Sequence, residues 1–466
     1  MSTERLRMTI RVDVPESGRS SPAPSRRNRW IDDWQPDDPS FWVSTGAVIA
    51  RRNLFFSVFT EHIGFSVWSL WSVLVLFLGP AYHIDPGGKF VLTAIPALVG
   101  SALRLPYTLA VTKFGGRNWT IISAVVLLVP TVATAIVLQP GVSYTTLLVI
   151  AAVAGIGGGN FASSMANINA FYPQQRKGWA LGINAGGGNL GVAVVQLAGL
   201  VVLATFGKDH PRIVAGIYIP LIVLAAVGAA LGMDNLSPAR KAGHAIRDAC
   251  RDVHTWIVSV LYIGTFGSFI GFCFAFGQVL QVQFKTDFAT PVNVAYLTFL
   301  GPLLGSLSRP AGGWLADRLG GARVTVCDFA AMAAATAVVL VASVHRSLGL
   351  FLAGFIALFV FSGIGNGSTY KMIPAIFRAK ARIAVDAGAD TVSDHHARRL
   401  TGALIGIAGA VGALGGVLVN VAFRQSFLAY KTGNAAYLAF LVFYALCSAV
   451  TWAAYLRPSQ RRLAGV

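Results

Sequence analysis

Two arginines stand inside long apolar stretches of the sequence, where charged residues are rare. Arg104 lies in "GSALRLPYTLAVTKFGG" (residues 100–116) and Arg309 in "GSLSRPAGGWLADRLGG" (residues 305–321). A charged side chain at the centre of a bilayer costs roughly 2.5–3.5 kcal/mol on insertion scales, so each position needs a compensating role. The guanidinium group is planar, always charged, and matches oxyanions through two parallel hydrogen bonds. Two such groups brought together would suit the binding of a small anion.

The alternative is that each arginine pairs with a buried carboxylate. We expect Glu61 to be the only acidic side chain well inside an apolar stretch, so few such partners are available. Glu61 stands beside His62 in "TEHIGFSVW" (residues 60–68), about two turns inside the first long apolar segment. A titratable pair inside an apolar segment is a candidate for binding and releasing a proton. Glu61 could instead neutralise a nearby arginine and lower its cost.

The composition is that of an integral membrane protein. Of 466 residues, 55% are hydrophobic and 12% are charged, whereas soluble domains carry about 25% charged residues. The mean hydropathy is +0.63. Apolar stretches long enough to cross a bilayer as helices recur along the whole chain. We predict an all-α fold with twelve spans, at residues 53–78, 89–112, 119–138, 144–170, 178–205, 212–233, 254–282, 290–314, 323–344, 348–377, 400–424 and 435–456.

The positive net charge of +18 follows the membrane topology. With both termini on the inner side, the inner segments hold 27 Lys and Arg residues and the outer segments hold 7. This asymmetry is the positive-inside pattern, and it argues against nucleic acid as a partner. The sequence therefore predicts a multi-pass protein of the cytoplasmic (inner) membrane, embedded in the lipid bilayer, with both termini cytoplasmic.

An internal repeat divides the chain into two halves. Gly100, Ser101 and Arg104 recur 205 residues later as Gly305, Ser306 and Arg309. The segment "GIGGGN" at 155–160 recurs 208 residues later as "GIGNGS". The segment "GWALGINAGGGNLG" at 178–191 is similar to "GALIGIAGAVGALGG" at 402–416. Chance similarity among Gly-rich apolar segments is the alternative, but three matches in order disfavour it. Parallel repeats of six helices are the arrangement of the major facilitator transporters, whose site lies near the midplane between the halves. The predicted units are a disordered cytoplasmic tail and lead-in (1–50), an N-terminal half (51–233), a cytoplasmic linker (234–253), a C-terminal half (254–456) and a cytoplasmic tail (457–466).

Glycines at a spacing of four mark the fifth and eleventh spans. Small residues at this spacing allow helix backbones to approach closely and to slide against each other. Tight packing alone is the alternative interpretation. Asparagines, including Asn160 and Asn184, are interleaved with the glycines of the fourth and fifth spans, and amides in hydrocarbon need partners. The predicted sliding glycines are Gly178, Gly182, Gly186, Gly187, Gly191, Gly402, Gly406, Gly412 and Gly416.

Several motifs resemble the nitrate/nitrite porter (NarK) family of the major facilitator superfamily. "GIGGGNFASSMANINAFYP" (155–173) and "GIGNGSTYKMI" (363–373) are similar to the two nitrate signatures of that family. The resemblance runs from about residue 32 to the C-terminus. It also includes "DDWQPDDPSFW" (32–42), "RNL" (52–54), "FGGRNWT" (114–120), "LYIGTFGSFIGF" (261–272) and "SRPAGGWLADRLGGARVT" (308–325).

The resemblance implies a carrier of nitrate and nitrite with no cofactor and no bound metal. It assigns anion binding to Arg104 and Arg309, aromatic stacking to three phenylalanines, and hydrogen bonds to Tyr262 and Asn184. Asn160, in the first of the two signatures, is a further predicted substrate-binding residue. The phenylalanines are Phe65, Phe161 and Phe266. Asp317 and Arg318 belong to a segment that resembles the inner-loop gate of the wider superfamily. The first-half counterpart of Asp317 is a threonine, so asymmetric gating contacts are expected.

Three functions remain open. Glu61 and His62 favour proton-linked uptake, a symport, over nitrate/nitrite exchange, an antiport. A membrane-embedded anion receptor is the third possibility, although the tail and the 378–400 loop resemble no effector domain. An enzyme is not expected, because the chain shows no metal-ligand spacing, nucleophile elbow or paired carboxylates. We expect a monomer.

Overall fold

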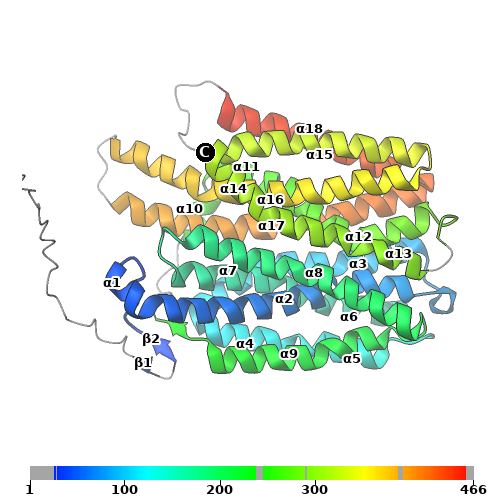
Figure 1. The fold of residues 1–466 in the computed structure, drawn as a ribbon, viewed down its shortest axis with the longest axis horizontal. Helices are drawn as coiled ribbons and strands as arrows, with labels where there is room; N and C mark the ends of the chain where they lie inside the picture. Colours follow the sequence, from blue (N-terminus) through cyan, green and yellow to red (C-terminus); the bar gives the residue numbers. More distant parts are fainter. Residues whose placement is uncertain (1–25, 28, 238–244, 289–290, 387–391, 458–466) are drawn as a thin grey trace, which may run out of the picture.

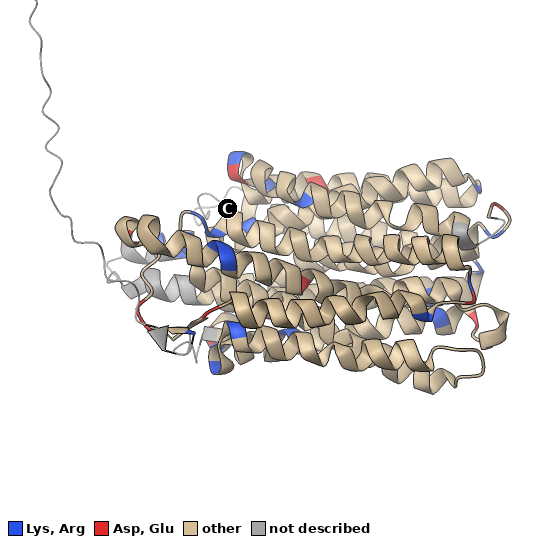
Figure 2. Cartoon of the chain, turned by 60° about the horizontal axis from the view of Figure 1, so that its bottom comes forward, with Lys and Arg blue, Asp and Glu red and all other residues tan. Residues whose placement is uncertain are grey.

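The computed structural model describes residues 26–27, 29–237, 245–288, 291–386 and 392–457. Long helices run side by side along the long axis of the molecule (Figure 1). The helices of the first half occupy one side of the bundle and those of the second half the other. Lys, Arg, Asp and Glu gather at the two ends of the bundle, whereas its middle is almost free of them (Figure 2). This distribution is the one that a bilayer requires.

Helices in the first half follow the predicted spans. Asp85 and Ser143 cap two of them, since their side chains accept hydrogen bonds from Gly88 N at 2.7 Å and Thr146 N at 3.1 Å. The elements are η2 (Pro80–Tyr82), α2 (Ala47–Phe77), α3 (Pro86–Phe114), α4 (Gly116–Val126), α5 (Leu128–Val137), α6 (Tyr144–Ala154), η3 (Gly155–Gly159), α7 (Asn160–Phe171), α8 (Lys177–Phe206) and α9 (Arg212–Gly232).

The second half repeats this plan. Gly115 ends α3 with φ +86° and Gly320 ends α14 with φ +89°, so the same sharp turn follows both arginine-bearing helices. A glycine is favoured there because other residues rarely adopt positive φ. The elements are α11 (Val253–Tyr262), η5 (Ile263–Gly267), α12 (Ser268–Gln283), α13 (Pro291–Thr298), α14 (Leu300–Leu319), α15 (Gly321–Val344), α16 (Leu348–Asp386), α17 (Val392–Tyr430), α18 (Asn434–Thr451) and η6 (Trp452–Leu456).

Among the described residues, 11 helical stretches are long and apolar enough to cross a membrane. The predicted span at 290–314 is the exception, because the structure divides it between α13 and α14. α14 also runs on to Leu319 and includes Arg309, Asp317 and Arg318, which lower its hydropathy. The first span begins earlier than predicted, since helix is continuous from Pro39 to Phe77.

The structure describes the lead-in to the first helix at residues 26–27 and from residue 29 onward. Its elements are β1 (Arg26–Arg27), β2 (Trp30–Ile31), α1 (Pro39–Phe41) and η1 (Trp42–Gly46). β2 pairs in parallel with β3 (Asn235–Leu236), in the linker after α9, which continues to α10 (Ala245–Cys250). The predicted disordered tail lies mostly outside the described residues, but the segment up to residue 50 is a structured strap across one end of the first half.

Asp234 joins this strap to the bundle. Its side chain is fully buried and forms salt bridges with Arg52 at 2.5 Å and Arg29 at 3.7 Å. Its backbone N–H donates to Asn53 Oδ1 at 2.9 Å. The "RNL" motif at the start of α2 therefore has a structural role, which is to hold the end of α9 against the start of α2.

Three polar contacts between the halves lie toward the end of the bundle where α3 begins. Thr93 Oγ1 donates to Asn420 Oδ1 at 2.9 Å, Gln278 Nε2 to the Pro86 carbonyl at 2.6 Å, and Gln196 Nε2 to the Cys273 carbonyl at 2.9 Å. These bonds connect α3 with α17 and α12, and α8 with α12. They close the interface on that side of the candidate site.

Candidate anion-binding site

Arg104 and Arg309 both point into the interior of the bundle. Arg104, on α3, is 0% exposed and Arg309, on α14, is 4% exposed. Their guanidinium carbons lie over the same ring, that of Phe161, at 4.6 and 5.8 Å from its centroid. In the described part of the chain, neither arginine forms a salt bridge with a carboxylate. The predicted meeting of the two cations at the interface of the halves is therefore what the structure shows.

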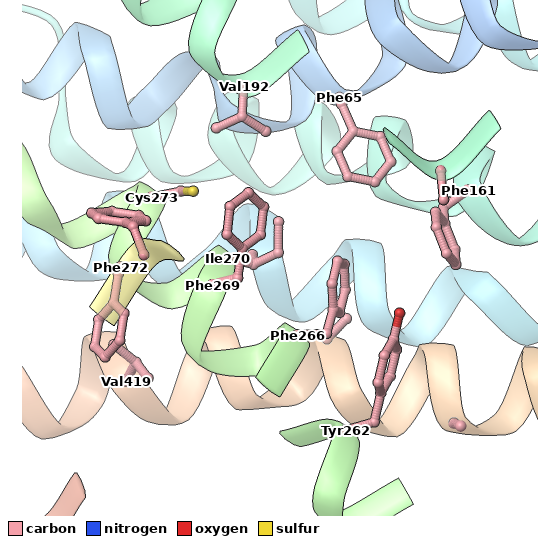
Figure 3. Packing of buried hydrophobic residues seen from close by; sticks show 14 of the residues in the cluster. Phe65, Phe161, Val192, Tyr262, Phe266, Phe269, Ile270, Phe272, Cys273 and Val419 are labelled. Carbon is pink, nitrogen blue, oxygen red and sulfur yellow. The ribbon is translucent and has the colours of Figure 1, made fainter. Parts of the chain in front are cut away.

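A row of aromatic rings crosses the interface beside these cations. Phe65 lies 6.1 Å from Phe161, Phe161 stacks on Phe266 at 5.9 Å, and Phe266 stacks on Tyr262 at 5.2 Å (Figure 3). Phe266 also lies 4.8 Å from the Arg104 guanidinium carbon. The first two rings come from the N-terminal half and the last two from the C-terminal half. All four predicted aromatic residues are thus brought together, and cation–π contacts stabilise the buried arginines.

The arginines have hydrogen-bonding capacity to spare. Arg104 Nη1 donates to the Gly409 carbonyl of α17 at 2.8 Å, and Arg309 Nη2 donates to the Tyr262 hydroxyl at 3.3 Å. Arg104 Nε and Nη2 and Arg309 Nη1 have no partner among the described residues. Nε and Nη2 share one edge of the Arg104 guanidinium plane. Such an edge can bind two oxygens of a planar oxyanion side by side.

Glu61 lies next to this site without touching either arginine. Its side chain is 1% exposed, and Oε2 accepts hydrogen bonds from Ser164 Oγ and from Asn184 Nδ2, the latter at 2.6 Å. Oε1 has no partner in the described chain. Both arginines lie within electrostatic range of this carboxyl group. Glu61 therefore joins α2, α7 and α8 and does not form a direct ion pair.

The structure gives Asn184 and His62 other partners than the sequence predicts. Asn184 Nδ2 is committed to Glu61 and to Ser164 Oγ at 2.8 Å, so this amide supports the carboxyl group. His62 Nδ1 donates to the Gly187 carbonyl at 3.0 Å, and no hydrogen bond joins His62 to Glu61 in the described residues. Consecutive residues on a helix point in different directions, which separates the predicted titratable pair.

Asn160 is a buried amide with both polar atoms free. It is 3% exposed, and neither Oδ1 nor Nδ2 has a partner among the residues that the structure describes. It packs against Gly64, where a Cβ would come within 2.5 Å of Nδ2. This amide is available to a ligand or to water.

The arginines make three contacts that none of the predicted site residues supplies. The Tyr370 ring lies 5.6 Å from the Arg309 guanidinium carbon, and its hydroxyl has no partner within the described chain. The Trp68 ring lies 5.5 Å from the guanidinium carbon of Arg104. The Gly409 carbonyl accepts from Arg104. Tyr370 stands inside the second nitrate signature, which was a usable signal, whereas a backbone carbonyl carries no mark in the sequence.

The glycines predicted to permit sliding fall into two groups. A Cβ on Gly187, Gly191 or Gly412 would meet another helix at 2.4, 2.1 or 2.4 Å, so these helices are in close contact. Gly182 and Gly186 have no described atom within 4 Å of a Cβ position. Intermediate distances occur at Gly178 (3.1 Å), Gly402 (3.9 Å), Gly406 (3.3 Å) and Gly416 (3.1 Å). The tightest of these contacts lie within one half, at Gly187, Gly191 and Gly412, whereas the glycines that face the opposite half, Gly178, Gly402 and Gly406, are packed more loosely.

Asp317 and Arg318, predicted as an inner-loop gate, have separate partners. Asp317 forms a salt bridge with Lys371 of α16 at 2.8 Å. Arg318 stacks over Trp314 at 4.0 Å. Lys371 Nζ lies 3.1 Å from the Cβ position of Gly178 on α8, so this ion pair sits against the opposite half. The first-half counterpart, Thr112, donates to its own helix at Leu109 O, and the contacts are asymmetric.

The described residues contain no group of three or more His, Cys, Asp or Glu side chains that could hold a metal ion. The chemistry that the site offers is that of two cations, aromatic faces and free amide and hydroxyl groups.

Comparison with known proteins gives a consistent result. The profile of the Major Facilitator Superfamily matches residues 54–420. The "Nitrate/nitrite transporter NarU" of Salmonella typhimurium is 38% identical over 458 residues, covering 93% of this chain and 98% of the relative. The "Probable nitrate/nitrite antiporter NarK2" of Thermus thermophilus is 32% identical, covering 94% and 99%.

Solved structures of major facilitator transporters share the fold. A bacterial homologue of the lysosomal transporter Spinster, in an inward-facing unoccupied conformation, superimposes with a TM-score of 0.61 at 15% identity, covering 87% of this chain and 97% of that one. The xylose transporter XylE from E. coli, in a partially occluded inward-open conformation, gives 0.60 at 15% identity, covering 91% and 99%.

Proposed function

The chain belongs to the nitrate/nitrite porter family of the major facilitator superfamily, and from this premise we propose that it carries nitrate and nitrite across the cytoplasmic membrane. The two six-helix halves rock about the central site and expose it to each side in turn. Both termini are cytoplasmic in this proposal. The names of the relatives support nitrate and nitrite as the transported anions.

The pair of buried arginines over Phe161 is the observation that carries the proposal. Nitrate is planar, singly charged and ionised at any cellular pH, so it cannot cross a membrane as a neutral acid. Its edge matches the free Nε–Nη2 edge of Arg104, and Arg309 Nη1 is free to reach it from the other half. In this proposal the Phe161 and Phe266 rings, which both contact the Arg104 guanidinium group, form an aromatic wall beside the anion.

Anion binding gives a reason for the halves to move together. Without an anion, the two guanidinium groups repel each other across the interface. A bound anion neutralises this repulsion and draws α3 and α14 toward the same ligand. The occupied transporter then switches more readily than the empty one, as a carrier that alternates between two faces requires.

Proton-linked uptake is the coupling that we propose. Glu61 is buried among three helices of the N-terminal half, close to both arginines, and its Oε1 has no partner in the described residues. Protonation of this carboxyl group changes the net charge beside the anion site by one unit. Proton binding and anion binding are therefore electrostatically coupled. Of the predicted pair, Glu61 carries this role, since His62 donates to the Gly187 carbonyl.

Exchange of nitrate for nitrite is the second candidate. It is favoured by the Thermus thermophilus relative, which is named as an antiporter and is 32% identical. In this scheme the charge of Glu61 stays constant, and the two anions alternate on the same pair of arginines.

Uptake of labelled nitrate into proteoliposomes, with and without internal nitrite and at two pH values, tests these alternatives. For proton-linked uptake, Glu61→Gln abolishes accumulation driven by a pH gradient but leaves nitrate counterflow. Asp209→Asn is the matched control, because it makes the same chemical change at an exposed loop carboxyl. If Glu61→Gln still accumulates nitrate in response to a pH gradient, the proton role of Glu61 is refuted. Uptake only with internal nitrite favours exchange, and binding without any tracer movement favours a receptor.

A further inference from the structure

A second carboxyl group is buried in the transmembrane region, in the half that does not contain Glu61. Asp328 stands on α15, seven residues after the helix begins at Gly321, and is 4% exposed. The expectation that Glu61 is the only acid deep inside a span is therefore wrong. Asp328 lies about 10 Å along its helix from that end, and its side chain faces the neighbouring helices.

The surroundings of Asp328 offer no charge to balance it. Oδ2 lies 2.1 Å from the Cβ position of Gly365, so the carboxyl group packs directly on the backbone of α16. Neither carboxyl oxygen has a hydrogen-bond partner, and no salt bridge reaches Asp328, within the described residues. The titratable groups that face this region come from α18. They are Tyr444, whose hydroxyl donates to Ser268 Oγ at 2.8 Å, and Cys447, which packs against Gly264.

Glu61 and Asp328 differ in the way they are held. Glu61 accepts two hydrogen bonds and lies within electrostatic range of two arginines, whereas Asp328 has neither kind of support in the described chain. An ionised carboxylate in a low-dielectric interior needs a cation or several donors, and without them it takes up a proton. The geometry therefore favours the neutral acid form of Asp328 in this conformation.

A short π-helical segment connects Asp328 with the anion site. Thr265, in η5 (Ile263–Gly267), packs on the same face of Gly365 as Asp328, since the same Cβ position lies 2.6 Å from Thr265 Cγ2. Phe266 of this segment stacks on Phe161 in the anion site. Single π-helical turns within α-helices are frequent at functional sites. Any movement of η5 that admits water to Asp328 also moves an aromatic wall of the anion site.

We propose that Asp328 is a second proton-binding site of this protein, located in the C-terminal half and coupled to the anion site through η5. Its carboxylate takes a proton from hydronium, forming an O–H bond and leaving water, and the neutral acid is then buried against Gly365. When η5 moves and water reaches the side chain, the proton returns to water. The coupling to nitrate rests on the proposed function, whereas the bound proton rests on the surroundings of Asp328 alone.

Infrared difference spectroscopy of the purified full-length protein tests the proton directly. The C=O band of a protonated carboxyl group is followed through a pH titration in wild type, Asp328→Asn and the control Asp209→Asn. We expect a band at neutral pH in wild type and in the control that is lost in Asp328→Asn. An unchanged band in Asp328→Asn overturns the proposal. Asp328→Ser gives the same comparison with a smaller side chain if the asparagine variant does not fold.

The nitrate affinity, measured by calorimetry on either side of the infrared transition, tests the coupling. We expect the Kd of wild type and Asp209→Asn to change several-fold between the two pH values and that of Asp328→Asn to change less. A pH dependence in Asp328→Asn equal to that of wild type overturns the coupling through η5. If wild type does not bind nitrate at all, the proposed function fails, while the infrared band still decides whether Asp328 holds a proton.

Discussion

Replacing Arg104 by lysine keeps the positive charge of the site and removes the planar fork. In the structure, Arg104 uses Nη1 for the Gly409 carbonyl at 2.8 Å and leaves Nε and Nη2 free along one edge. A lysine ammonium is a point charge that cannot present two parallel donors in a plane while it also holds that carbonyl. We therefore expect Arg104→Lys to bind nitrate through one fewer charge-assisted hydrogen bond.

The size of the effect follows from that one bond. A hydrogen bond to a charged group contributes about 1.5–3 kcal/mol. Since about 1.4 kcal/mol corresponds to a tenfold change in affinity, nitrate should bind roughly 10- to 150-fold more weakly to Arg104→Lys. Arg104→Gln, which removes the charge as well, should bind more weakly still, because Arg309 alone then balances the anion.

Isothermal titration calorimetry of the purified protein with nitrate measures this directly. Arg212→Lys is the matched control, since Arg212 is a partly buried arginine whose Nε donates to the Leu138 carbonyl at 2.9 Å, outside the interface of the halves. Its variant should bind nitrate as wild type does. A normal Kd for Arg104→Lys would refute bidentate recognition, and the charge alone would then explain anion binding.

Three further substitutions and one control test the packing and the charges at the site and at the ends of the helices. Gly412→Ala places a Cβ 2.4 Å from Tyr262 Cδ1, so we expect weaker nitrate binding and a loss of about 1–3 kcal/mol of stability. The control Gly182→Ala, with no described atom within 4 Å, should unfold at or slightly above the wild-type temperature, because alanine is the better helix former. Asp234→Asn removes the buried carboxylate bound to Arg52 and Arg29, and chemical denaturation should show a loss of about 1.5–3 kcal/mol; an unchanged midpoint would contradict its role in holding the strap. Asp317→Asn breaks the ion pair with Lys371, and the Asp317 side chain is 61% exposed. Because exposed ion pairs contribute little, thermal unfolding should show a loss of less than about 1 kcal/mol, and a larger loss would contradict this reasoning.

The sequence alone determined the membrane class, the helical spans and the repeat. In a bilayer, a helix satisfies all of its backbone hydrogen bonds within its own segment, so the length and apolar character of each span can be read locally. The span at 290–314 was predicted as one continuous helix, whereas the structure divides it between α13 and α14. The two arginines could be singled out because lipid-buried charge is costly and therefore rare.

Only the tertiary structure decided which groups those arginines meet. Gly409 and Tyr370 are far from Arg104 and Arg309 in sequence, and their contacts exist only because helices of both halves pack together. Burial likewise distinguishes Asp328 from an acid near a helix end, which its position in the sequence cannot do. Charge and apolar length are local properties of a chain, whereas the partner of a buried polar group is set by packing between distant segments.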